Sequence, residues 1–342
     1  MKTNLILFLV GWCLLAGAAW LQAAEPRDVT IQVGKDHVDF LVGKELVTRY
    51  HTGPDLAKPY AWPVYGPHQV PLTRAWPMEK ALPGGSTDHV HQKSLWFGHG
   101  DIIPEGVPLK QKSKGVEGVD YWAEAPGHGR EVCTEVGKPH EDRNHGWITT
   151  HNDWLTAEGT KILDETRTLH LYDFGATRLL VFDIDLRADV PVTFGDTKEG
   201  TMGVRVNDLI AEAHGRGKIE NAEGKVGEKA CWGRPSAWCD YSGPIEGRVE
   251  GIAILDDPSN PPACWHSRAY GLMAANPFGR AKSGFPAMKG KTDLIHLARG
   301  EHLKFRYGVL LHPGDAKEGK VGHYYQEFVA LGKHHADRKN GE

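Results

Sequence analysis

A histidine-rich stretch near residue 90 carries the side chains best suited to chemistry. His89 and His91 are separated by one residue, and His99 and Asp101 follow shortly after. Because alternate residues of an extended strand point to the same face, this spacing predicts that the imidazoles of His89 and His91 lie side by side. With His99, Asp101 or a distant histidine they could bind a divalent metal ion. Without a metal, the pair could transfer protons on a sugar or bind a ligand, or simply brace a loop through hydrogen bonds.

A second candidate group lies at residues 266–270. Strand-like alternation places His266, Arg268 and Tyr270 on one face. Cationic, aromatic and hydrogen-bonding side chains on a shared face suit an acidic or hydroxylated ligand. The alternative is a solvated face of a sheet.

A third group lies between glycines at residues 195–206. A simple hairpin turn needs only Asn, Asp and Gly, whereas this stretch adds charged side chains. Glu199 is our candidate catalytic base, and Arg205 is its candidate ion-pair partner. A plain surface turn in which Glu199 is solvated is the alternative.

The hydrophobic pattern predicts an all-β fold to position these residues. Stretches with period-two alternation are separated by glycines and prolines spread along the chain. We expect strands at residues 30–33, 38–42, 147–151, 162–172, 178–186, 192–194, 202–206, 251–255, 270–274 and 303–311. Their number and length suit one large β-sandwich domain over residues 25–342.

The C-terminal part of the chain carries a helical pattern. Val321, Tyr324, Tyr325, Phe328 and Val329 follow the spacing of one helix face. This predicts a C-terminal helix that packs across a sheet.

The first 24 residues have the features of a secretory signal. Lys2 precedes an apolar stretch over residues 5–21, and small residues follow at Ala23 and Ala24. We therefore expect a periplasmic or secreted protein with no membrane span after cleavage. The formal net charge of −4 argues against nucleic acid as a partner.

Four cysteines follow the signal, at positions 133, 231, 239 and 264. In an oxidising compartment they could form disulfides in three pairings, or they could stay reduced and buried. The sequence contains no Gly-x-Ser-x-Gly, Gly-x-Gly-x-x-Gly, Gly-Lys-Ser/Thr or His-Glu-x-x-His motif. Their absence counts against the usual serine hydrolases, dinucleotide-binding enzymes, kinases and zinc proteases.

Several segments together resemble one bacterial family of exported proteins. They are residues 49–51, 59–63, 73–78, 88–91, 96–101, 195–200, 232–241 and 274–279. The family carries the label "methane oxygenase PmoA", its domain is otherwise one of unknown function, and the resemblance runs from about residue 28 to 332. The family's usual Asp-His-Pro-His-His has Val90 and Gln92 here, so His89 and His91 are the matching pair.

In its length and β-rich character, this family is similar to proteins with the galactose-mutarotase-like supersandwich, a fold found in enzymes that act on sugars. Tryptophans beside polar residues fit that use, because an aromatic face packs on sugar C–H groups, although core packing explains them equally well. Our candidates for substrate binding are Arg74, Trp96, His99, Asp101, Arg205, Trp238, Arg268 and Asn276.

The leading hypothesis is an exported carbohydrate-active protein that performs acid/base chemistry on a sugar or glycan. His89 or His91 is the candidate acid, Glu199 the base, His266 a further catalytic residue, and Arg268 stabilises negative charge. A divalent metal held by His89 and His91 could assist. The alternatives are a non-catalytic carbohydrate-binding protein and a metal-dependent oxygenase, as the family label suggests. A membrane oxygenase subunit needs several apolar helices of about 20 residues, and the sequence after the leader contains none.

Overall fold

The fold is built from two large antiparallel sheets, described by a computed structural model over residues 25–339. The predicted signal over residues 1–24 lies outside the described residues. The first sheet has eight strands in the order β1 (Val29–Val33), β2 (His37–Val42), β3 (Glu45–His51), β4 (Tyr60–Val64), β5 (Leu95–His99), β13 (Gly200–Arg205), β18 (Leu272–Asn276) and β17 (Cys264–Trp265).

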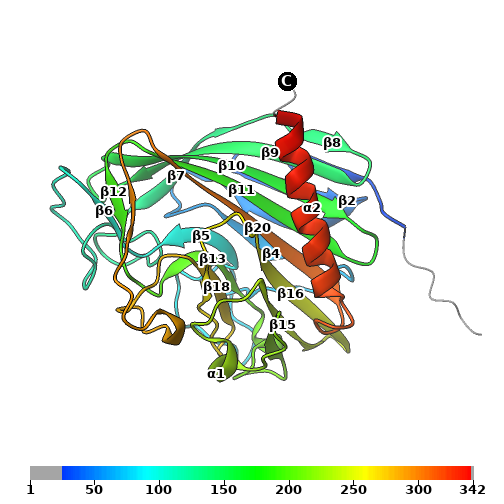
Figure 1. Cartoon of the computed structure of the whole chain (residues 1–342). Helices are drawn as coiled ribbons and strands as arrows, with labels where there is room; N and C mark the ends of the chain where they lie inside the picture. The colour runs from blue at the N-terminus through cyan, green and yellow to red at the C-terminus, as the bar shows by residue number, and fades with distance from the viewer. Residues whose placement is uncertain (1–24, 340–342) are drawn as a thin grey trace, which may run out of the picture.

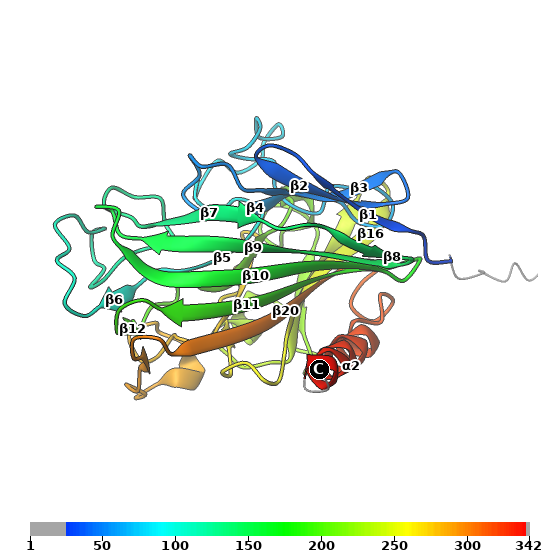
Figure 2. The same cartoon turned by 90° about the horizontal axis from the view of Figure 1, so that it is seen from above.

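The second sheet has nine strands, and Figure 2 shows several of its long strands side by side. Its order is β14 (Lys218–Asn221), β15 (Trp238–Ile245), β16 (Arg248–Asp256), β20 (His302–Pro313), β11 (Arg178–Ala188), β10 (Lys161–Asp173), β9 (His145–Leu155) and β7 (Arg130–Val136), with β8 (His140–Asp142) also paired to β9. A small sheet joins β19 (Ile295–Leu297), β12 (Val192–Phe194) and β6 (Ile102–Pro104).

The main core lies between the two large sheets. Alternation sends Phe97 of β5 and Met202 of β13 into it from the first sheet, and Phe305 and Tyr307 of β20 from the second. The ring of Phe97 lies 5.8 Å from that of Phe305. The eight-stranded sheet therefore has its opposite face, called the outer face below, available for other residues.

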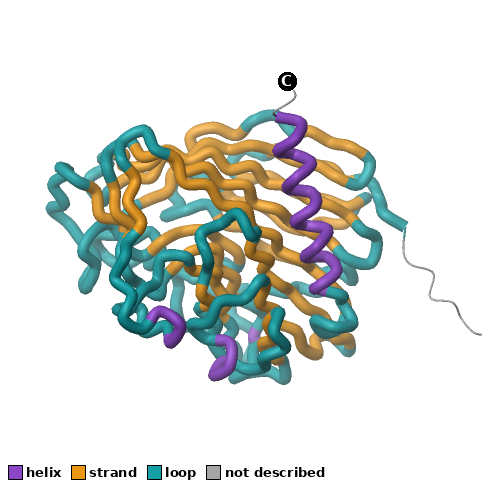
Figure 3. The backbone as a smooth tube through the Cα atoms, in the orientation of Figure 1, coloured by secondary structure: helices purple, strands orange, loops and turns teal. Residues whose placement is uncertain are grey.

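A long helix covers the other side of the nine-stranded sheet. Helix α2 (Val321–Lys339) crosses this sheet in Figure 1 and appears as the long purple helix in Figure 3. Val321 and Phe328 are buried against Leu179 and Val181 of β11 and Leu255 of β16. The shorter helical segments are α1 (Glu228–Cys231) and the 3₁₀ turns η1 (Asp208–Ile210) and η2 (Pro286–Met288).

The structure confirms the all-β sandwich, the C-terminal helix, and a strand at each of the ten predicted positions. Several strand bounds differ by a few residues; for example, Tyr270 lies in a turn and β18 begins at Leu272. Cys133, Cys231, Cys239 and Cys264 are free thiols, and all except Cys133 are buried. In the part of the chain that the structure describes, no helix has the length and apolar character needed to cross a membrane.

Candidate functional site

The outer face of the eight-stranded sheet carries an aromatic layer. Trp96 of β5 is buried there, and its indole lies 4.9 Å from that of Trp122, which comes from the loop after β6. Gly203 of β13 provides the space for both rings, because a Cβ at this position would lie 2.9 Å from atoms of each. The candidate Trp96 is thus part of the buried aromatic layer, and only 2% of it is exposed.

Two buried arginines next to this layer share one carboxylate. Arg74 Nη1 donates to Asp88 Oδ1 at 2.6 Å, and Arg205 Nη2 donates to the same oxygen at 2.7 Å. Arg74 is 2% exposed and Arg205 is fully buried, whereas the Asp88 side chain is 40% exposed. Buried guanidinium groups need a paired anion, so Asp88 stabilises both.

The pKa of Asp88 reflects this pairing. Partial burial acts to raise it, but Arg205 and the hydrogen bond from Arg74 more than offset that effect, and the pKa lies below its usual value. Asp88 is therefore a carboxylate at neutral pH.

The predicted pairing of Arg205 with Glu199 is wrong. Arg205 lies on β13, opposite Leu272 of β18, and its guanidinium donates to Asp88 and Gln92 instead.

The extended backbone expected at His89 and His91 is also wrong. Residues 89–92 form a turn in which the Gln92 amide donates to the His89 carbonyl at 2.9 Å. His89 adopts a left-handed conformation with φ of 43°, which is uncommon for a residue with a side chain. Arg74 Nη2 donates to the carbonyls of Asp88 and His89 at 3.0 and 3.1 Å, and these bonds hold the turn in place.

The turn nevertheless brings the two imidazoles together. Their ring centroids lie 5.7 Å apart in an edge-to-face arrangement. His89 Nδ1 lies 3.0 Å from Asp88 Oδ2, and its ring stacks on that of Tyr270 at 5.0 Å. Tyr270 also carries the guanidinium of Arg205 over its ring at 4.6 Å. One aromatic ring thus positions a histidine and an arginine from different strands and loops.

The second candidate group lies on the hairpin formed by β17 and β18. His266 pairs with Ala274 through backbone hydrogen bonds, and residues 268–271 form the turn. Alternation predicted that His266, Arg268 and Tyr270 share one face of a strand. This prediction is wrong, because the three residues do not lie on one regular strand. They still come together, because the turn folds Tyr270 back so that the Arg268 guanidinium lies 5.9 Å from its ring.

Glu199 faces His266 at the start of β13. The distance between Glu199 Oε2 and His266 Nδ1 is 4.0 Å, which is longer than a hydrogen bond. His266 is 2% exposed, and its Nδ1 has no hydrogen-bond partner within the described residues. The Glu199 side chain is 34% exposed, so it is the more accessible of the two groups.

Burial shifts the pKa of these two groups in opposite directions. It lowers the pKa of His266 to about 3, with the nearby charges of Lys198 and Arg268 adding to the shift. Burial raises the pKa of Glu199, although Lys198 opposes the change. At neutral pH a neutral imidazole thus faces a carboxyl group with increased proton affinity, an arrangement suited to proton transfer. We call His89, His91, Glu199, His266, Arg268 and Tyr270 the histidine site.

A lysine that the sequence analysis did not single out lies next to His91. Lys58 is 2% exposed, donates to the Trp122 carbonyl at 2.9 Å, and lies 3.6 Å from Glu124 Oε1. Burial lowers the pKa of His91 to about 3, and the charge of Lys58 adds to this effect. Lys58 sits in a loop without a recognisable motif, so no local signal could have identified it. Asp88, in contrast, directly precedes the predicted His89, and Tyr270 belongs to the group predicted at residues 266–270.

Three of the predicted substrate-binding residues brace loops instead of joining the histidine site. His99 is fully buried, with Nε2 3.0 Å from the Gly195 carbonyl and its ring 4.6 Å from that of Phe278. Asp101 accepts the Gly118 amide at 2.7 Å. Asn276 donates to the Thr197 carbonyl at 2.9 Å and so holds the loop that precedes Glu199.

Of two further candidates, Trp238 lies away from the histidine site and Arg268 belongs to it. Trp238 of β15 packs with Tyr172 and Phe328 in the cluster between α2 and the nine-stranded sheet. The main core separates this cluster from the histidine site. Arg268 remains in the histidine site, and its Nε lies 3.2 Å from Glu228 Oε1.

Within residues 25–339, no group of three or more His, Cys, Asp or Glu side chains is arranged to hold a metal ion. His89 and His91 therefore stand as a pair without a third such ligand among the described residues.

Comparison with known proteins gives a family and several similar folds. A family model described as "Family of unknown function (DUF6807)" matches residues 37–326. No curated protein matches the chain. A galactose mutarotase-like protein from Clostridium acetobutylicum is 6% identical, with a TM-score of 0.35, over 84% of this chain and 99% of that one.

Two other solved structures show the same level of similarity. A galactose mutarotase-like protein from Lactobacillus casei is 10% identical, with a TM-score of 0.30, over 83% of this chain and 100% of that one. A GH36 α-galactosidase from Geobacillus stearothermophilus is 11% identical, with a TM-score of 0.33, over 84% of this chain. The matched region spans 40% of that α-galactosidase.

Proposed function

The chain belongs to the DUF6807 family, whose function is unknown, and we propose that it is an exported enzyme that performs acid/base chemistry on a sugar or glycan. One observation supports this proposal above the others. Glu199 Oε2 lies 4.0 Å from His266 Nδ1, which has no hydrogen-bond partner among the described residues, and both lie beside a histidine whose own ring is oriented by a carboxylate. A sugar hydroxyl placed beside the more accessible Glu199 could give its proton to that carboxylate.

The proposed roles follow from protonation state and position. Glu199 accepts a proton from a sugar hydroxyl when it is a carboxylate. His89 delivers a proton to a second oxygen of the sugar, because its Nδ1 is held by Asp88 and Nε2 is the other ring nitrogen. His91 has a pKa of about 3 and is neutral near pH 7, so the role of acid falls to His89.

The remaining residues stabilise charge and position the substrate. Arg268 stabilises an anionic group or a developing oxyanion on the sugar. His266 is neutral near pH 7 and borders Glu199, with its Nδ1 4.0 Å from Glu199 Oε2. The half-buried ring of Tyr270 already packs on His89 and Arg205 and keeps them in place. One proton leaves the sugar and one returns, so the step needs no added redox partner.

The test uses the full chain and a panel of neutral and acidic oligosaccharides, with products followed by mass spectrometry and NMR. We expect the wild type to convert at least one of them and Glu199→Gln to reduce the rate about 100-fold or more. Glu223→Gln, an exposed carboxylate in the turn after β14, should leave the rate unchanged.

Two results would count against the proposal. Full activity of Glu199→Gln on a proven substrate would show that Glu199 is not the base. Binding of a glycan without any product would instead identify a non-catalytic carbohydrate-binding protein. A secretion assay of the full chain, with and without residues 1–24, tests export separately.

A further inference from the structure

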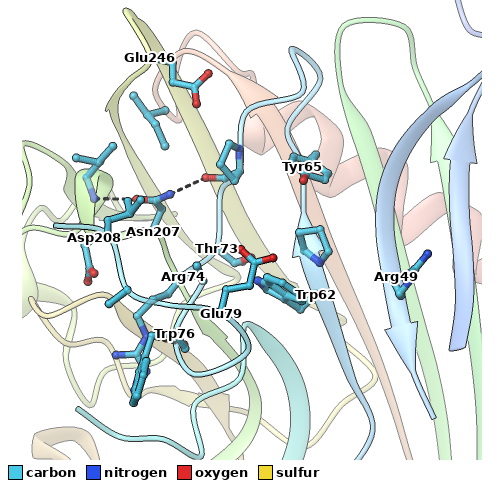
Figure 4. Close-up of a pocket in the computed structure, with 17 residues that line it drawn as sticks. Arg49, Trp62, Tyr65, Thr73, Arg74, Trp76, Glu79, Asn207, Asp208 and Glu246 are labelled. Atoms are coloured by element: carbon cyan, nitrogen blue, oxygen red, sulfur yellow. Dashed lines mark hydrogen bonds between the residues drawn. The ribbon is translucent and has the colours of Figure 1, made fainter. Parts of the chain in front are cut away.

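A pocket of about 500 Å³ lies beside the histidine site, between the loop after β4 and the turn η1. Figure 4 shows Asp208 and Asn207 on one side of it, Trp62 and Tyr65 on the other, and Trp76 below. Its volume falls within the range of small-molecule sites, which is roughly 300–1,000 Å³.

Hydrogen bonds of Asn207 join the two walls of the pocket. Asn207 Nδ2 donates to the Pro71 carbonyl at 3.0 Å, and Asn207 Oδ1 accepts the Leu209 amide at 3.0 Å, as the dashed lines in Figure 4 show. The Asn207 amide also donates to the Leu72 carbonyl at 2.8 Å. The two walls are therefore tied together by one buried side chain and its backbone.

The lining combines aromatic rings with polar groups. Trp62, Tyr65 and Trp76 supply the rings, and the Nε1 donor of Trp76 is buried without a hydrogen-bond partner in the described part of the chain. Rings of this kind pack on the C–H groups of a sugar, while donors and acceptors bind its hydroxyls.

The charges of the lining favour a neutral ligand. Glu79, Asp208 and Glu246 contribute three carboxylates. Of the two lining arginines, Arg49 is already paired with Asp39 at 2.6 Å, and Arg74 is paired with Asp88. An acidic sugar would meet these carboxylates without an unpaired guanidinium among the lining residues to offset them.

A chain of hydrogen bonds connects the pocket to the histidine site. Ser86 Oγ donates to Asp208 Oδ1 at 2.7 Å and accepts from Arg74 Nη1 at 3.1 Å. Arg74 lines the pocket, and its guanidinium also donates to Asp88, the carboxylate that holds His89. The two sites thus share a wall.

We infer that this pocket is a second sugar-binding subsite, which binds the residue next to the sugar held at the histidine site. The inference rests on the proposed function and specifies its substrate class. The substrate is then a neutral oligosaccharide or glycoside of at least two units, and a single sugar fills only part of the binding surface.

The experiment measures binding of neutral glycans of one to four units by glycan array and isothermal titration calorimetry, with uronic-acid-containing glycans of the same lengths for comparison. Wild-type protein should bind a neutral glycan of two or more units about tenfold more tightly than the single sugar. Leu209→Trp, at a 48% exposed position on the pocket lining, should block the pocket and remove this gain.

Two further variants make the result interpretable. Trp76→Ala removes an aromatic contact and should weaken binding of the longer glycan about fivefold, without changing the affinity for the single sugar. Val33→Trp, at an equally exposed position on β1, should bind all glycans as the wild type does.

The possible failures are distinct. If single sugars are bound and converted but longer glycans bind no more tightly, or if Leu209→Trp and Trp76→Ala bind them normally, the subsite is refuted and the proposed function stands. If uronic-acid-containing glycans bind more tightly than neutral ones, the inferred substrate class is wrong. If sugars of every length are neither bound nor converted, both proposals fall.

Discussion

The imidazole of His89 stacks on the phenol ring of Tyr270, with ring centroids 5.0 Å apart and the ring planes inclined by 12°. The two residues come from distant parts of the sequence: one lies in the loop before β5 and the other at the tip of the β17–β18 hairpin. Their contact joins the two groups of candidate residues into one site.

This contact predicts that the ring of Tyr270 positions His89, while its hydroxyl matters less. On a proven substrate, Tyr270→Phe should retain the wild-type rate within about threefold, and Tyr270→Ala should lose about tenfold or more. NMR of the His89 ring protons provides a readout separate from activity, because the ring-current shift from Tyr270 should persist in the Phe variant and vanish in the Ala variant. Unchanged His89 signals in Tyr270→Ala would contradict the stacking.

Removing the charge of Asp88 should destabilise the protein. Asp88→Asn keeps the shape but leaves Arg74 and Arg205 without their shared carboxylate. We expect a loss of about 2 kcal/mol in the free energy of unfolding, less than for a fully buried pair because Asp88 is partly exposed. Urea unfolding at pH 7 measures the loss. Asp55→Asn, in an exposed loop, should change stability by less than about 0.5 kcal/mol, and an equal effect of the two variants would refute the role of Asp88.

Burial of His266 should make stability depend on pH. Its pKa is about 3 in the folded protein and close to its ordinary value of about 6.5 in the unfolded chain. Between these values the unfolded state binds a proton that the folded state does not, so the free energy of unfolding decreases as the pH falls from 6.5 toward 3, whereas above about pH 6.5 this histidine adds no pH dependence.

The matching variant is His266→Gln. From pH 6.5 down to 4.5, the wild type should lose stability relative to this variant with a slope that approaches about 1.4 kcal/mol per pH unit. Urea unfolding at several pH values gives the difference, and His323→Gln on an exposed position of α2 serves as the control. Parallel pH curves for the wild type and His266→Gln would show that the buried imidazole does not resist protonation.

The aromatic layer below the site should tolerate no added volume at Gly203. A Cβ there would lie 2.9 Å from both Trp122 and Trp96, so Gly203→Ala should cost about 1–3 kcal/mol and lower the melting temperature. Gly322→Ala in α2 meets nothing within 4 Å and should be neutral or stabilise the helix by up to about 1 kcal/mol. Thermal unfolding of the two variants measures both effects, and equal melting temperatures would mean that the layer is loosely packed.

Most of the architecture could be predicted from the sequence because strands and helices leave periodic signals. The alternation at residues 162–172 and 178–186 reflects one face on the main core, and both became long neighbouring strands. The spacing from Val321 to Val329 likewise reflects the buried face of α2. Periodicity carries no information on which strands are neighbours, so the pairing of β5 with β13 and of β13 with β18 was not predicted.

The candidate site was predicted in composition but not in geometry. His89 and His91 do come together, yet through a turn that Arg74 holds from another loop, and local alternation cannot detect such a contact. Glu199 faces His266 although it does not pair with Arg205. His99 and Asp101 follow the histidine-rich stretch in sequence, but strand β5 turns His99 into the core and Asp101 holds a neighbouring loop.

By itself, the sequence determined the all-β class, the C-terminal helix and the set of residue types available for acid/base chemistry, because each of these depends on local patterning. Only the tertiary structure decided which of those residues meet. The convergence of His89, Glu199, His266 and Tyr270 depends on strand order, on the loop before β5 and on the turn of the β17–β18 hairpin. The large pKa shift of His266 depends on burial, which a sequence does not display until the chain has folded around it.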